Sequence, residues 1–279
     1  HVAGAAVDVF NTEPPGLTRL LPSEKVICTP HLGASTREAQ DNVAVAVAAQ
    51  IRDFLLTGTI RNAVNAPAVS GEALETLKPY LELAQRMGLF LGNMIQTGIK
   101  SVEAQYSGDV GTMDVKPITT TFLTGLLTPI MMDDVNLVNA PMVAEDRGIK
   151  VSETKVSKSE HFTSVVRFKV VTENREHDVE GTLFGRSTPR MVRYGLFRGE
   201  FDLCGELILL HAYDKPKVIG QVGLTLGEKG INISHFQFAR EEAGGQALLF
   251  LNTDTKADES ALEALRQLPN VIGVRTLTI

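Results

Sequence analysis

Hydrophobic and polar positions are patterned differently in three regions of the chain, and the first region spans residues 1–58. It has short apolar runs at 5–10 and 25–29, which are typical of strands covered on both faces, as in a parallel sheet. A capping box from Ser35 to Glu38 then predicts the start of a long helix. One face of that helix is expected to be buried, because apolar residues recur at every fourth position: Ala39, Val43, Val47, Ile51 and Leu55.

The second region follows a polar, proline-ended connection at 62–67. Apolar residues at spacings of three and four predict a helix over 72–97, which Pro79 could split near its start. We expect an α+β domain that ends near residue 203. Its further helices are expected at 118–131 and 140–146, and its strands at 102–106, 162–172, 179–184 and 191–196.

The third region reads strand, helix, strand, strand, helix, strand, which is the ferredoxin-like βαββαβ plan. Its expected elements are 207–213, 217–226, 231–239, 246–252, 260–268 and 271–279. The patterns together predict a multidomain chain of α/β and α+β type. Its domains are expected to be the end of a Rossmann-type dinucleotide-binding domain with a long helix at 1–66, an α+β domain at 67–204 and a βαββαβ domain at 205–279.

Composition narrows the classes of function. Apolar residues make up 43% of the chain and charged residues 22%, which is ordinary for a globular protein. A formal net charge of -6 gives no electrostatic case for a nucleic-acid or membrane-surface partner. No apolar run approaches the roughly 18 residues of a membrane span. Cys28 and Cys204 lie far apart between apolar residues, which predicts free thiols in a reducing cytoplasm. The scattered histidines predict no metal site.

Three residues near the start combine acid and base chemistry. Asp8 lies within an apolar strand, Glu13 in the loop just past it, and His31 directly after the second strand. Ligands of an open α/β sheet bind outside the carboxyl ends of its strands, where Glu13 and His31 fall. A carboxylate beside a histidine fixes the tautomer and favours the imidazolium, so the two form an acid/base pair. Each residue alone is also consistent with a purely structural role.

Two segments around these residues carry a family resemblance: Ala3-Gly-Ala-Ala-Val-Asp-Val-Phe-x-x-Glu-Pro14 and Val26-Ile-x-Thr-Pro-His-Leu-Gly-Ala-Ser-Thr-x-Glu-Ala-Gln40. They resemble the D-2-hydroxyacid dehydrogenases, and within them the long D-3-phosphoglycerate dehydrogenases. The resemblance implies that His31 exchanges the hydroxyl proton of 3-phosphoglycerate and that Glu13 pairs with it. It also implies that Asp8 lies near the nicotinamide of NAD and that Gly33 lies beside this cofactor.

The resemblance also bears on what this stretch of chain holds. The arginine that binds the substrate carboxylate and the glycine-rich phosphate loop both come from earlier family segments that do not occur in this sequence. The chain opens without Met and runs directly into a strand-like segment. We therefore expect it to be the C-terminal part of a larger protein, and to be inactive in isolation.

The middle domain resembles the intervening domain of long phosphoglycerate dehydrogenases and of one class of iron–sulfur serine dehydratases. Arg190 follows Pro189 at a position where this domain tends to carry a base, and anion binding is one interpretation of it. The favoured alternative is a solvated strand face that includes Arg193. The matching segments begin at Pro79, Gly125, Val135 and Gly181.

The last domain resembles ACT domains, which are small modules that bind amino acids. Asp214 and Pro216 precede its first expected helix, and Gly227 and Asn232 follow that helix. The resemblance implies that Asp214 and Asn232 hold an effector such as L-serine where two copies meet, so we expect a homo-oligomer. We also expect these two residues to lie close together at one end of neighbouring central strands.

Two departures from the ACT pattern leave serine binding open. Lys217 stands where the family usually has Gly, a residue that allows close backbone approach to a ligand. Ala212 stands where serine-binding relatives often place a polar ring. His211, one residue away, is expected to point to the opposite face of the strand.

The favoured interpretation is part of an NAD-dependent phosphoglycerate oxidoreductase of serine biosynthesis that carries a regulatory domain. One alternative is a non-catalytic module for amino-acid sensing and oligomerisation. Another is a serine dehydratase subunit, against which the complete Thr-Pro-His-Leu-Gly segment from Thr29 argues. A third is a different D-2-hydroxyacid dehydrogenase, against which the two later domains argue.

Overall fold

The computed structural model describes residues 2–16, 18–57, 62–63, 72–131 and 135–279. The chain divides into two compact units, His1–Ala63 and Val64–Ile279, which are considered separately below. Most of the connection expected at 62–67 lies outside the described residues. Among the helices of the described ranges, none is both long and apolar enough to cross a membrane.

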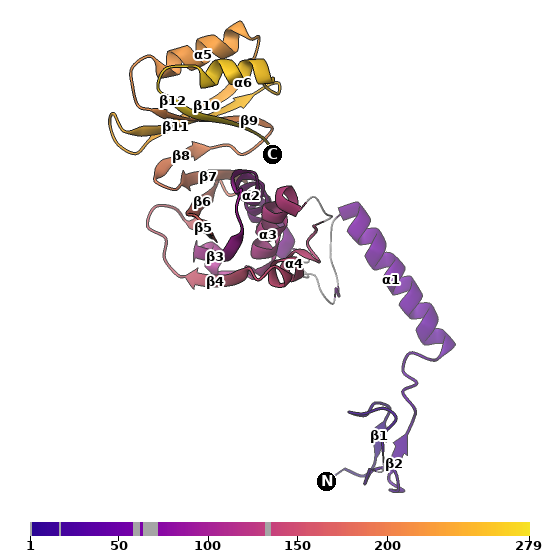
Figure 1. Ribbon diagram of the computed structural model, residues 1–279. Helices are drawn as coiled ribbons and strands as arrows, with labels where there is room; N and C mark the ends of the chain where they lie inside the picture. Colours follow the sequence, from indigo (N-terminus) through magenta and orange to yellow (C-terminus); the bar gives the residue numbers. More distant parts are fainter. Residues whose placement is uncertain (1, 17, 58–61, 64–71, 132–134) are drawn as a thin grey trace. The chain divides into compact units, whose positions relative to one another are not determined.

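The first unit contains two short strands and one long helix (Figure 1). Strands β1 (Ala5–Val7) and β2 (Val26–Cys28) pair in parallel, with Ala5 opposite Val26 and Val7 opposite Cys28. Both strands are shorter than the apolar runs predict. The side chain of Asp8, which follows β1, accepts hydrogen bonds from the loop that follows β2.

Helix α1 (Arg37–Thr57) begins one residue later than the capping box predicts. The hydroxyl of Thr36, and not that of Ser35, accepts a hydrogen bond from the backbone N–H of Ala39 at 3.1 Å. The expected buried face is wrong for the described residues, since α1 has no buried residue. Its apolar stripe is exposed, and the exposed fractions of Val43 and Leu55 are 56% and 74%.

The second unit begins with two helices that pack closely. Helix α2 (Glu72–Met94) runs unbroken through Pro79, so the expected split does not occur. Helix α3 (Lys116–Met131) lies against it. Glycines make the close approach possible: a Cβ at Gly88 would lie 2.4 Å from the carbonyl oxygen of Phe122, and one at Gly125 would lie 2.4 Å from that of Gln85.

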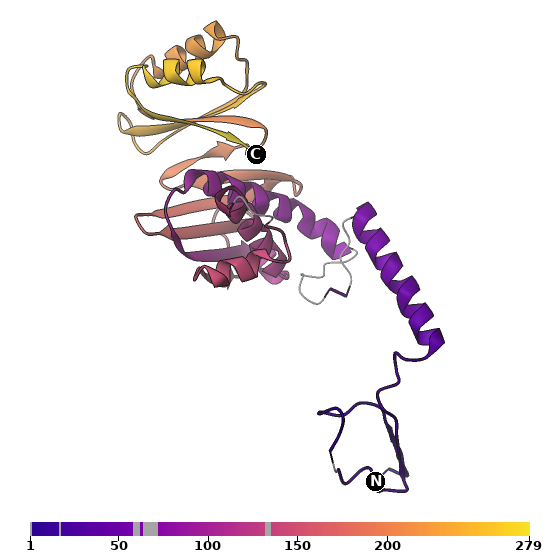
Figure 2. The ribbon, with the colours of Figure 1, turned by 45° about the vertical axis from the view of Figure 1, so that its right-hand side comes forward.

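A six-stranded sheet carries these helices on one face, in the order β4-β3-β5-β6-β7-β8 (Figures 1 and 2). The apolar side of the sheet joins the helices in one core, in which the rings of Phe122 and Phe168 stack at 3.7 Å. The 3-10 turn η1 (Asp109–Thr112) and helix α4 (Ala140–Asp146) complete the connections. The strands are β3 (Ile99–Gly108), β4 (Lys150–Val156), β5 (Ser164–Thr172), β6 (Glu176–Phe184), β7 (Thr188–Tyr194) and β8 (Phe197–Phe201).

Two of these strands are absent from the sequence prediction, and both lie at the edges of the sheet. Strand β4 pairs in parallel with β3 but buries no side chain, so polar residues fill it and no apolar alternation marks it. Strand β8 is five residues long and buries only Phe201 fully. Edge strands need fewer apolar residues than central ones, which is why their pattern is weak.

The last elements follow the order strand, helix, strand, strand, helix, strand, and their strands form a sheet in the order β10-β11-β9-β12. Helices α5 and α6 cover one face of this sheet (Figure 1). The alternation along β9 divides its side chains: Ile208 and Leu210 face the helices, whereas Leu207 and Leu209 face the preceding sheet and helices. The elements are β9 (Glu206–Tyr213), α5 (Val218–Glu228), β10 (Ile233–Arg240), β11 (Gln246–Thr253), α6 (Glu259–Arg266) and β12 (Val271–Thr278).

The facing sides of the two sheets share one hydrophobic core, which is separate from the core between the last sheet and its own helices. Phe250 of β11 is its central contact, since its ring lies 4.3 Å from that of Phe201 and 5.7 Å from that of Phe90. The ring of Phe90 also meets that of Tyr194 edge to face at 5.1 Å. The face of the last sheet that points away from α5 and α6 therefore lies inside the unit, against the six-stranded sheet and its helices.

Candidate functional site

Asp8 organises the loop that carries the candidate catalytic histidine. It follows β1, and its carboxylate accepts hydrogen bonds from the hydroxyl of Thr29, from the N–H of Leu32 at 2.7 Å and from the N–H of Gly33 at 2.9 Å. These bonds, with that from Thr29 first, lower the pKa of Asp8. Gly33 fits this close contact, because a Cβ there would lie 3.3 Å from the same carboxylate.

Glu13 and His31 lie in direct contact, and their role as an acid/base pair stays a prediction. The Oε2 atom of Glu13 lies 2.7 Å from Nδ1 of His31, and its Oε1 atom accepts the backbone N–H of Phe10 at 3.0 Å. The bond from His31 lowers the pKa of Glu13, and the same bond raises the pKa of His31. An ionised carboxylate can only accept, so Nδ1 carries the proton, and in the neutral ring Nε2 has a free lone pair.

The backbone of His31 also suggests a specialised position. Its φ angle is 54°, in the left-handed region that side chains other than glycine rarely adopt. Such conformations cluster at functional sites. The imidazole borders a cavity of about 430 Å³ with a mostly apolar wall, which includes Phe10, Leu21 and Pro30. His31 can therefore meet a small ligand on one side while Glu13 holds it on the other.

The chemistry open to this arrangement is proton exchange. Nε2 of His31 can take a proton from a bound hydroxyl, and the charge of Glu13 stabilises the imidazolium that forms. Within the residues that the structure describes, no group of three or more His, Cys, Asp or Glu side chains is arranged to hold a metal ion.

The first candidate effector residue, Asp214, is engaged by the hairpin between β10 and β11. Its Oδ2 atom accepts from Arg240 at 2.9 Å and from the N–H of Gly244 at 3.0 Å. The bond from Gly244, followed by that from Arg240, lowers the pKa of Asp214. Asp214 is thus ionised and fixed at the carboxyl end of β9.

The second candidate, Asn232, does not lie beside Asp214. It precedes β10 and donates to Asp254 at 2.7 Å. The expectation that the two residues share one end of the sheet is wrong, because β11 lies between β9 and β10 and runs antiparallel to both. The end of β9 and the start of β10 are therefore at opposite ends of the sheet.

The structure shows the surroundings of Lys217 and Ala212, the two positions that depart from the ACT pattern. Lys217 caps the start of α5 with φ 78°, so glycine suits this position through its backbone conformation. Ala212 is fully buried among the residues that face α5 and α6. His211 points to the other face, as expected, and its ring meets that of Phe197 edge to face.

Arg190 and Arg193 are not on a solvated strand face. The exposed fractions of their side chains are 19% and 14%, and both are ion-paired. Arg190 lies 3.2 Å from Asp202, and Arg193 lies 2.8 Å from Asp178 and 2.7 Å from Glu180.

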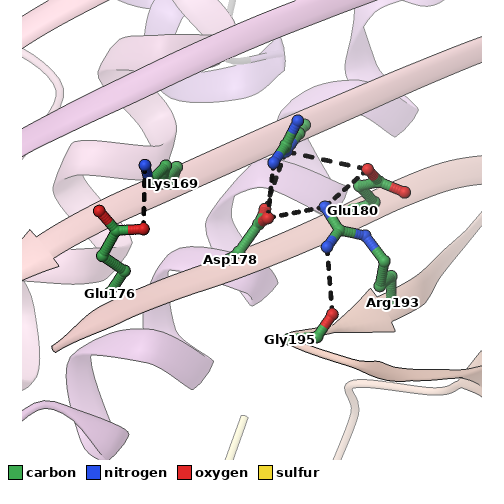
Figure 3. A network of polar contacts seen from close by, with 7 residues as sticks. Lys169, Glu176, Asp178, Glu180, Arg193 and Gly195 are labelled. Carbon is green, nitrogen blue, oxygen red and sulfur yellow. Dashed lines mark hydrogen bonds and ion pairs between the residues drawn. The ribbon is translucent and has the colours of Figure 1, made fainter. Parts of the chain in front are cut away.

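The Arg193 pairs belong to a larger network on the sheet face away from the helices. Its members are Arg167, Asp178, Glu180 and Arg193. Figure 3 shows it together with the separate Lys169–Glu176 pair. Burial would raise the pKa of Asp178, but bonds from Arg167 and Arg193 lower it overall. Two arginines facing two carboxylates balance in charge, so this cluster has no excess charge to attract a ligand.

Thr29, Phe10 and Leu32 are hydrogen-bonding residues of the candidate site to which the sequence assigned no role. Thr29 donates to Asp8, and the N–H of Phe10 donates to Glu13. A signal was available for Thr29, which directly follows β2 and stands two residues before His31. No signal was available for Phe10, because a backbone N–H has no sequence pattern.

Comparison with family models gives two matches in the second unit. Residues 76–194 match the D-3-phosphoglycerate dehydrogenase intervening domain. Residues 207–270 match the ACT domain. The two matches follow each other in the order that the sequence resemblance implies.

Curated relatives extend the similarity to the whole chain. D-3-phosphoglycerate dehydrogenase of Bacillus subtilis (strain 168) is 35% identical over 280 residues, which cover 100% of this chain and 53% of the relative. The enzyme of the same name from Methanocaldococcus jannaschii is 34% identical over 278 residues, with the same coverage of 100% and 53%. That from Archaeoglobus fulgidus is 35% identical over 274 residues, or 97% and 52%. The chain spans about half the length of these relatives.

Proposed function

The chain belongs with the D-3-phosphoglycerate dehydrogenases, matching the C-terminal part of these relatives, and from that premise we propose that its protein oxidises 3-phosphoglycerate with NAD, in the cytoplasm, as a step of serine biosynthesis. The single observation that carries the proposal is the bond between Glu13 and Nδ1 of His31, which leaves Nε2 free at the wall of a cavity.

In the proposed reaction, Nε2 of His31 takes the proton of the substrate hydroxyl as the carbon–hydrogen bond beside that hydroxyl breaks. The hydroxyl oxygen becomes a ketone oxygen, and His31 becomes an imidazolium. Glu13 supports this step, because its negative charge lies 2.7 Å from the ring nitrogen that stays protonated throughout. NAD supplies the hydride acceptor.

The described residues fit only the reacting end of such a cofactor. The backbone of Gly33 lies beside the histidine loop, and Asp8 holds that loop in place, so we assign both to the nicotinamide end. A glycine-rich phosphate loop does not occur in this sequence. The interpretation of residues 1–66 as the end of a Rossmann-type domain remains part of the proposal.

We also propose that the ACT domain regulates the enzyme by binding a small amino acid, with L-serine as first candidate. Within one chain Asp214 and Asn232 are too far apart to share a ligand, so the site requires a second copy. Strand β10 is an edge strand, and edges invite pairing. Antiparallel pairing of two β10 strands about a two-fold axis would bring Asp214 of one copy toward Asn232 of the other.

Turnover of 3-phosphoglycerate with NAD by the full-length protein tests the catalytic assignment. His31→Ala should lower kcat by roughly 10²–10⁴, the usual range for a lost acid/base group. His161→Ala, which removes an exposed histidine of the second unit, is the matched control and should turn over normally. Near-normal turnover of the His31 variant would overturn the assignment. Faster oxidation of lactate than of 3-phosphoglycerate would favour a different 2-hydroxyacid dehydrogenase.

The pH profile separates the role of Glu13 from that of His31. Oxidation needs an unprotonated Nε2, so the rate should fall as the pH drops through the raised pKa of His31. Glu13→Gln removes the partner that raises this pKa. The acid limb of the profile should therefore move to lower pH while kcat also falls. An unmoved acid limb would mean that Glu13 does not tune His31.

A further inference from the structure

A second cavity, of about 430 Å³, lies in the second unit between the intervening domain and the ACT domain. The β5–β6 hairpin and β6 border it from one side, and β9 and β12 border it from the other. Leu209, Leu248 and Ile272 give it an apolar wall, and Arg175 and Arg275 bring charge to it from the two domains. It contains none of the residues assigned above to catalysis or to the effector.

The positive charge of this cavity is uncompensated. Its two acidic lining residues are committed elsewhere: Glu176 pairs with Lys169 at 3.0 Å, and Asp178 pairs with Arg167 and Arg193 (Figure 3). By contrast, neither Arg175 nor Arg275 forms an ion pair with any residue in the described part of the chain.

Both guanidinium groups act on the same small volume. The charges of Arg175 and Arg275 both lower the pKa of the buried His177, for which burial is the largest cause, to about 4. The same two charges oppose the rise in the pKa of Tyr194 that its burial causes. Two like charges that reach the same pair of buried side chains repel one another, and an anion between them would relieve that repulsion.

Histidines in the cavity wall complete a set of hydrogen-bonding groups. His177 is 4% exposed and is neutral near pH 7, and its Nε2 accepts from Nε of Arg175 at 3.1 Å. That bond holds the Arg175 side chain in place and leaves its terminal nitrogens for a ligand. The Nε2 atom of His211 is buried without a hydrogen-bond partner in the residues described. Because His211 lines the cavity, the tautomer with a proton on Nε2 can donate to an anion there.

We propose that this cavity binds a small oxyanion, a carboxylate or a phosphate group, between Arg175 of the intervening domain and Arg275 of the ACT domain. Guanidinium groups match both oxyanions through paired N–H donors. The apolar wall suits the short carbon body of an organic acid. Because the two arginines come from different domains, the bound anion ties the domains together and stabilises the unit by mass action.

Calorimetric titration of the full-length protein tests the site without relying on turnover. The probes are inorganic phosphate, malonate and phosphonoacetate, which separate phosphate from carboxylate recognition. Arg175→Gln and Arg275→Gln should each weaken the bound probe roughly 10- to 100-fold, the usual loss for a charged hydrogen bond. Arg147→Gln is the matched control, since Arg147 is exposed after α4 and does not line the cavity; its affinity should be unchanged.

A second variant tests the cavity while leaving the charges in place. Ile272→Trp should fill the space beside the arginines and abolish binding, and since Ile272 is 47% exposed the larger ring need not disturb the core. Unfolding midpoints without any anion establish that each variant is folded. The proposal is overturned if none of the three probes binds, if the Arg175→Gln/Arg275→Gln double variant binds as many probe molecules per chain as the parent, or if Ile272→Trp does so.

Discussion

Helices α1 and α2 have similar apolar spacing, but the apolar face of α1 is exposed and that of α2 is buried. In α1 no residue is buried, and Leu55 is 74% exposed. In α2, Leu83, Met87 and Leu91 are at most 1% exposed, because α3 and the six-stranded sheet cover them. Periodicity therefore predicts that a helix forms and which face is apolar, but not whether a partner for that face lies within the same unit.

The two units also differ in what causes the pKa shifts of their side chains. In the first unit, the pKa values of Glu13 and His31 shift because the two side chains bond to each other while both remain partly exposed. In the second unit, the pKa of His177 shifts mainly because the residue is buried. Protonation of His177 should therefore change the free energy of unfolding of the second unit. Protonation of the Glu13–His31 pair should instead change the rate of the proposed reaction.

The strongest test of the shared core in the second unit is Phe250→Ala. The ring of Phe250 joins the two sheets through Phe90 and Phe201, so its loss should lower the free energy of unfolding by about 3–5 kcal/mol. Urea unfolding of the full chain measures the effect. Leu196→Ala is the control, because Leu196 is 75% exposed, and it should change stability by less than about 0.5 kcal/mol. Equal effects of the two changes would mean that the sheets are independent.

Acid should destabilise the second unit through His177. Its pKa is about 4 in the folded protein and 6.5 in the unfolded chain, so between these values the unfolded state binds more protons. The free energy of unfolding should therefore fall as the pH falls through this window. By pH 4.5 the expected loss is about 2–3 kcal/mol.

Unfolding in urea at pH 7.5 and 4.5, in a buffer free of phosphate, measures this loss. His177→Gln keeps a hydrogen-bond acceptor for Arg175 but does not titrate, so it should lose less stability than the parent between the two pH values. If the parent and the variant lose the same amount, another group governs the acid sensitivity.

Much of the fold could be predicted from local pattern, with limits set by position in the sheets. The central strands β5 and β9 were predicted closely, because both alternate clearly or are continuously apolar. The edge strands β4 and β8 were missed, because an edge needs little apolar surface. The wrong strand order had a larger consequence for the site. Because β11 lies between β9 and β10, Asp214 and Asn232 do not lie close together.

The sequence predicted which residues meet in the candidate site, but it did not predict most of the hydrogen bonds between them. Glu13 and His31 come together as their positions past two parallel strands imply, because parallel strands end at one edge. Their catalytic roles stay predictions. Asp8 could be placed near them, but its bonds to Thr29, Leu32 and Gly33 depend on a loop conformation that no periodic pattern encodes.

The smallest expected effect concerns Lys217, whose φ of 78° matches the left-handed backbone of His31 in the other unit. In that region a side chain costs roughly 1–2 kcal/mol, and glycine avoids the cost but loses about 0.5–1 kcal/mol through its freer unfolded state. Lys217→Gly should therefore raise the free energy of unfolding by up to about 1 kcal/mol. Lys217→Ala removes the same charge but keeps the Cβ, so it should bring no such gain. Urea unfolding of both variants decides the matter: equal stability of the two would show that the backbone at this position is not strained.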